Sequence, residues 1–81
     1  MTYAERYNIV ADEYADMEER LFREYRTLSV YERNGWVFEA DGLRGAISGH
    51  EAKLQSLRRQ LNDLDWAMRK ERYYDKKRMG S

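Results

Sequence analysis

The chain has 81 residues, of which 37% are charged and 42% are hydrophobic, and its 15 basic and 15 acidic residues cancel. It contains no cysteine, which excludes a disulfide framework and thiolate chemistry. It contains no proline either, and this composition favours long helices in a single domain spanning residues 1–81.

The first predicted helix covers about residues 3–33. Thr2 and Glu5 have the spacing of a capping box at its start, and the pair Asn34-Gly35 can end it because glycine adopts the left-handed conformation. Between these limits, apolar residues recur at spacings of three, four or seven, which is typical of one helix face. They are Tyr3, Tyr7, Val10, Tyr14, Met17, Leu21 and Leu28.

The predicted turn, residues 34–41, contains three consecutive large apolar residues from Trp36 to Phe38. Two interpretations are open. In the favoured one, these side chains fold over the last pair of apolar residues, Tyr31 and Leu43, and close the end of the core. In the other, they form an exposed apolar tip that docks onto a partner.

The second predicted helix covers about residues 42–77 and is followed by a short basic tail, residues 78–81. Its apolar residues alternate spacings of four and three without a break, which is the heptad pattern of a coiled coil. Asp41 is favoured over Ser48 as its cap, although glycines in this region each cost ~1 kcal/mol relative to alanine. The heptad positions are Leu43, Ile47, His50, Leu54, Leu57, Leu61, Leu64 and Met68.

The short turn places the two helices antiparallel. In such a hairpin the numbers of facing residues have a constant sum, and pairs such as Tyr14 with Leu61 and Leu21 with Leu54 give 75. The predicted fold is therefore all-α, an antiparallel, coiled-coil-like two-helix hairpin. A chain this short buries little surface, so we expect a homo-oligomer, with dimerisation into a four-helix bundle as one arrangement.

One layer of the predicted core is polar. Glu24 on the first helix and His50 on the second fall at the same level, where a buried pair can fix the register or act as a pH-sensitive latch. Alternatively, Glu24 points outward and Tyr25 takes the core position. A lone histidine without cysteine lacks the ligands of a typical zinc site, so we expect no metal.

No catalytic motif is visible. The glycine-rich segment 42–49 lacks the Lys-Ser/Thr ending of a phosphate-binding loop, and neither an HExxH motif nor a Ser–His–Asp arrangement is present. We therefore expect a protein that is not an enzyme and needs no cofactor.

The face of the second helix that points away from the core combines aromatic and basic residues. Such residues dominate protein interfaces, and they also contact nucleic acid. A protein partner, a second copy of the chain and nucleic acid are three candidate occupants, and the zero net charge disfavours the last. The candidate partner-binding residues are Arg59, Trp66, Arg69, Tyr73 and Lys76, with Trp36 and Phe38 at the turn. The outward face of the first helix is expected to be acidic, through Glu5, Asp12, Asp16 and Glu19.

These features predict a small non-enzymatic regulator, adaptor or inhibitor, of a type common in phages and mobile elements, that binds a larger protein and acts by steric occlusion. The alternative is a nucleic-acid-binding accessory protein that uses the basic and aromatic face of the second helix. No apolar run approaches the ~20 residues that span a bilayer, and polar residues already occur within the first five positions. We therefore expect a cytoplasmic protein without membrane contact.

Overall fold

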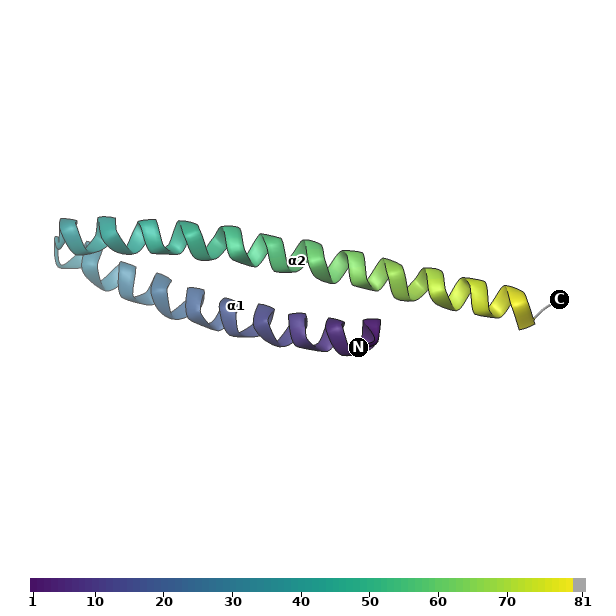
Figure 1. Ribbon diagram of the computed structural model, residues 1–81. Coiled ribbons are helices and arrows are strands. Elements are labelled where there is room, and N and C mark those ends of the chain that lie inside the picture. The colour runs from purple at the N-terminus through teal and green to yellow at the C-terminus, as the bar shows by residue number, and fades with distance from the viewer. Residues whose placement is uncertain (80–81) are drawn as a thin grey trace.

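The computed structural model describes the backbone of residues 1–79 and the side chains of residues 1–74. Two helices, α1 (Tyr3–Arg33) and α2 (Val37–Met79), pack side by side and run in opposite directions (Figure 1). No strand occurs within residues 1–79. The predicted all-α hairpin is confirmed, and the molecule is a rod with extents of 68 × 18 × 14 Å.

The start of α1 follows the predicted cap. The Thr2 hydroxyl oxygen accepts a hydrogen bond from the backbone N–H of Glu5 at 3.1 Å. This bond satisfies one of the backbone donors that the first turn of a helix leaves free. The cap and the predicted span 3–33 are confirmed, since α1 begins at Tyr3 and ends at Arg33.

The turn between the helices is a Schellman motif. The backbone N–H of Trp36 donates to the Tyr31 carbonyl at 3.0 Å, and that of Gly35 donates to the Glu32 carbonyl at 3.2 Å. Gly35 has a φ of +70°, the left-handed conformation that ends helices of this type. The rings of Tyr31 and Trp36 lie 5.8 Å apart, which is the apolar contact that accompanies the motif.

The turn is shorter than predicted, and this corrects the start of the second helix. α2 begins at Val37, ahead of both predicted caps, Asp41 and Ser48. The Schellman motif reverses the chain within residues 34–36, so the next residues are free to be helical. Ala40 is then placed against α1 and is 2% exposed, because its small side chain fits where the two helices converge. The predicted basic tail also changes: α2 continues to Met79, and residues 80–81 lie outside the described residues.

The core of the hairpin is a single row of side chains between the two helices. Among residues 1–74 only four apolar side chains are buried. Most of the other predicted core residues are half-buried, because each helix has a single neighbour, and Tyr3 is exposed. The buried residues are Leu21, Ala40, Ile47 and Leu57. α2 is longer than α1 by about three turns and projects beyond the N-terminus (Figure 1).

Candidate interaction surfaces

The polar layer of the hairpin joins α1 to α2. His50 Nδ1 lies 2.7 Å and 3.0 Å from the two carboxylate oxygens of Glu24, and the two side chains are 28% and 16% exposed. Tyr25 is exposed instead of taking the core position. The structure thus brings Glu24 and His50 together in one half-buried layer, in the register that the sequence predicts.

Two further side-chain contacts join the helices. The Tyr25 hydroxyl donates to the Glu51 carboxylate, and Arg44 contacts Glu32 at 3.2 Å. Within α2, Arg44 also forms an ion pair with Asp41 at 2.7 Å. The hydrogen bond from Tyr25 to Glu51 is the main cause that raises the pKa of Tyr25 above its ordinary value of 10.0. Desolvation by neighbouring atoms and the negative charges of Glu51 and Glu24 act in the same direction.

We expect the two members of the polar layer to depend on each other. Glu24→Leu alone leaves His50 without its carboxylate, and should lower the free energy of unfolding by about 1–3 kcal/mol. Adding His50→Leu completes an apolar layer, so the double variant should be at least as stable as wild type. Urea unfolding followed by circular dichroism measures both values, with Glu32→Ala as an exposed-pair control that costs less than about 1 kcal/mol. A double variant less stable than Glu24→Leu would contradict the interpretation.

A second prediction concerns alkaline pH. Because the pKa of Tyr25 is higher in the folded chain, the unfolded chain loses this proton first as pH rises through about 10. The stability that Tyr25 contributes is thus complete below pH 10 and declines above it. The difference in unfolding free energy between wild type and Tyr25→Phe should shrink between pH 9 and pH 11. The other tyrosines are common to both proteins and cancel, so a difference that stays constant over this range would refute the assignment.

The apolar residues at the turn are divided between two roles. Trp36 packs on Tyr31 and is half-exposed, whereas Val37 and Phe38 point away from the core and Phe38 is 91% exposed. The favoured interpretation, in which all three close the end of the core, is wrong for Val37 and Phe38. They belong to the first turn of α2, and the buried position of that turn is taken by Ala40.

The outward face of α2 is exposed, as the heptad pattern implies. Trp66 is 68% exposed, Arg59 and Tyr73 are exposed as well, and Arg69 forms an ion pair with Asp65 at 3.2 Å. The side chain of Lys76 lies outside the described residues. Phe38, Trp66 and Tyr73 are separated by multiples of seven residues, so they occupy one edge of α2. We call this edge the α2 ridge: Phe38, Gly45, Ala52, Arg59, Trp66 and Tyr73.

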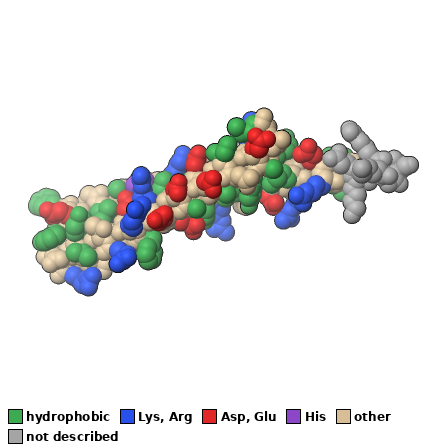
Figure 2. All heavy atoms as spheres, turned by 90° about the horizontal axis from the view of Figure 1, so that it is seen from below, with side chains coloured by type: hydrophobic (Ala, Val, Ile, Leu, Met, Phe, Trp, Pro, Cys, Tyr) green, Lys and Arg blue, Asp and Glu red, His purple; other side chains and the backbone are tan. Residues whose placement is uncertain are grey.

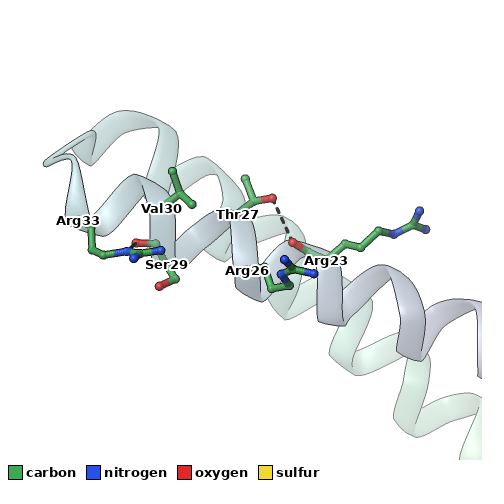
Figure 3. A pocket seen from close by; sticks show the side chains of 6 residues that line it. All are labelled: Arg23, Arg26, Thr27, Ser29, Val30 and Arg33. Carbon is green, nitrogen blue, oxygen red and sulfur yellow. Dashed lines mark hydrogen bonds between the residues drawn. The ribbon is translucent and has the colours of Figure 1, made fainter.

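A basic groove on α1 was not predicted. Its volume is about 530 Å³, and every lining residue is exposed, so it does not enclose a small molecule (Figure 3). The lining residues are Arg23, Arg26, Thr27, Ser29, Val30 and Arg33. The acidic residues expected on the outward face of this helix lie nearer its N-terminus; the signal for the basic part is the spacing of three and seven between Arg23, Arg26 and Arg33.

The described residues hold no cluster of three or more histidine, cysteine, aspartate or glutamate side chains placed to bind a metal ion. Within the same part of the chain, neither helix has an apolar stretch long enough to traverse a bilayer. No family model, curated protein or solved structure matches the chain.

Proposed function

We propose that this chain is a small non-enzymatic protein-binding module that regulates, adapts or inhibits a larger protein by steric occlusion. The single observation that carries the proposal is the exposed apolar tip. Phe38 is 91% exposed, and Val37 beside it is 65% exposed. An aromatic side chain held this far out of the core contributes nothing to folding, and it gains free energy when a partner buries it.

The backbone supports this role because it holds the tip in place. The Schellman hydrogen bonds fix residues 34–36, and Ala40 anchors the first turn of α2 in the core. A tip that is ordered before binding loses little conformational entropy on docking. The rod shape of the hairpin then gives the docked chain a long body with which to cover a neighbouring site.

The rest of the α2 ridge, which continues from Phe38 along the same edge of the helix, offers a second set of contacts. Trp66 follows Phe38 by 28 residues, which places the two rings roughly 42 Å apart along the helix. Tryptophan, tyrosine and arginine are the residues that most often carry the binding energy of interfaces. A partner that spans the ridge would contact the tip at one end and Trp66 at the other.

The test is affinity capture from a host lysate, identification of the partner and measurement of the dissociation constant with purified proteins. Phe38→Ala and Trp66→Ala should each weaken binding by about 30-fold or more, the loss expected at an interface hot spot. Glu39→Ala, an exposed neighbour of Phe38, is the matched control and should bind as wild type does. Unchanged affinity in both aromatic variants would reject the proposal.

A nucleic-acid partner would behave differently in the same experiment. Its binding would weaken steeply with salt and would be abolished by Arg69→Glu, because phosphate contacts depend on positive charge. Docking of a protein on the apolar tip is far less sensitive to salt. A steep salt dependence with no effect of Phe38→Ala would favour the nucleic-acid function instead.

A further inference from the structure

The outer face of α1 is divided into an acidic and a basic half. The acidic half contains Asp12, Glu13, Asp16 and Glu19, and the basic half contains Arg20, Arg23, Arg26 and Arg33. All eight side chains are exposed. In the space-filling view of this side, basic side chains gather toward the turn and acidic ones farther along the rod (Figure 2). We call this surface the α1 charge face.

None of these eight charges forms an ion pair within residues 1–74. The four ion pairs in that part of the chain involve Glu32, Asp41, Arg44, Glu24, His50, Asp65 and Arg69. Arg26 lies 5.9 Å from the centre of the Phe22 ring, and Arg33 donates to the Ser29 carbonyl. Ion pairs within this part of the hairpin therefore do not account for the division.

The helix dipole does not explain the division either. A dipole favours acids at the N-terminus and bases at the C-terminus, but its effect falls off within the first and last turns. Asp12, Asp16, Arg23 and Arg26 lie in the middle of a helix that runs from Tyr3 to Arg33. A charge pattern in that region is best explained by something that contacts the side of the helix.

A second α1 placed antiparallel on this face sets six of the eight charges opposite a charge of the other sign. When a two-fold axis passes between Glu19 and Arg20, facing residues have numbers that add to 39. Asp16 then faces Arg23 of the other copy, and Ile9 faces Val30. In the same register Glu13 faces Arg26 and Glu19 faces Arg20. By symmetry each contact occurs twice.

The two apolar residues make this register specific. Ile9 and Val30 are 47% and 41% exposed, and they occupy the same heptad position as Asp16 and Arg23. They are the outermost members of that row, so the interface has charged pairs at its centre and an apolar contact at each end. One pair is unfavourable, since Arg6 faces Arg33, but it lies at the ends of the contact, where solvent and salt screen it.

We propose that the α1 charge face binds a second copy of this chain, giving an antiparallel dimer in which the two turns point in opposite directions. The small core supports the same occupant, because four buried side chains are few for the 74 residues whose side chains are described, and a second hairpin would cover α1. The arrangement leaves Phe38 and the α2 ridge free. It therefore goes beyond the proposed function and does not depend on it.

Charge reversal in two complementary variants tests this interface. The first variant makes the six paired positions acidic, and the second makes the same six positions basic. Each variant alone should be monomeric by sedimentation at low salt, and an equimolar mixture should form a heterodimer. The acidic variant carries Arg20→Glu, Arg23→Glu and Arg26→Glu, and the basic variant carries Glu13→Arg, Asp16→Arg and Glu19→Arg. The charge-matched control on α2, Arg59→Glu with Arg69→Glu and Arg72→Glu, should remain a dimer.

The register is tested separately by cross-linking, because the natural chain has no cysteine. Asp16→Cys mixed with Arg23→Cys should form a mixed disulfide in at least tenfold excess over either variant alone. This measurement stands even if a triple variant fails to fold. A monomeric wild type at ~100 μM, equal dimerisation of both charge-reversed variants, or loss of the dimer in the α2 control alone would overturn the proposal. Phe38→Ala should leave the dimer intact, so failure here is distinguishable from failure of the proposed function.

Discussion

Replacing Gly42, Gly45 and Gly49 with alanine should raise the free energy of unfolding by about 3 kcal/mol. All three glycines lie inside α2, where each costs ~1 kcal/mol relative to alanine. Beyond the adjoining residues and the nearby helix backbone, a Cβ atom added at any of them has no neighbouring atom within 4 Å. The substitutions therefore remove the entropic cost of glycine without creating a clash, and the expected total is the sum of three single gains.

Gly35→Ala is the matched control, and its effect should have the opposite sign. Space is also open at Gly35, but its φ of +70° is unfavourable for any residue with a Cβ atom. The substitution should lower the free energy of unfolding by about 1 kcal/mol. Urea unfolding at one fixed protein concentration measures both variants. A triple variant that is no more stable than wild type would show that something packs against these glycines.

Leu57→Ala should destabilise the hairpin more than any other single truncation between the two helices, lowering the free energy of unfolding by about 2–5 kcal/mol. Leu57 is 2% exposed and is the largest fully buried side chain among the described residues. A hairpin with one row of core residues has few neighbours that can move into the space. Since the total stability of small proteins is about 5–15 kcal/mol, the loss should be visible as partial unfolding on mild heating.

Phe38→Ala serves as the control for the size of the removed side chain. Phenylalanine is larger than leucine, yet Phe38 is almost fully exposed, so its truncation should change the stability by less than about 0.5 kcal/mol. Thermal and urea unfolding of Leu57→Ala and Phe38→Ala, measured side by side, shows whether the loss of stability depends on the burial of the removed side chain or only on its hydrophobicity. Similar losses in both would mean that Phe38 is buried in solution, and the proposed docking tip would be lost with that result.

The polar layer is a feature of the fold that the sequence alone predicts. Glu24 and His50 were paired from a constant sum of residue numbers alone, and they are in hydrogen-bond contact in the structure. The constant sum predicts facing residues because a helix rises by a constant distance per residue. Once one pair of facing residues in an antiparallel hairpin is known, all other pairs follow. Prediction of Leu21, Ile47 and Leu57 as core residues depends on the same regularity.

The turn shows where the prediction failed. The predicted second helix starts near Asp41, a possible cap, whereas α2 begins at Val37 and already includes the buried Ala40. Local propensity near a turn is weak compared with one buried contact, and Ala40 has no strong hydrophobic signal of its own. The sequence does not predict the basic groove for another reason. Exposed arginines are typical of an ordinary solvated helix face, and only the structure shows that Arg23, Arg26 and Arg33 form no ion pair within residues 1–74.

The amino-acid sequence by itself determined the two helices, their antiparallel register and the pairing of Glu24 with His50, because these follow from a periodicity that local geometry enforces. Only the tertiary structure decided that the chain turns within three residues, that Phe38 is exposed and that the eight residues of the α1 charge face form no ion pair within residues 1–74. These features depend on which atoms occupy the space beside a residue, and that information is absent from any spacing along the chain.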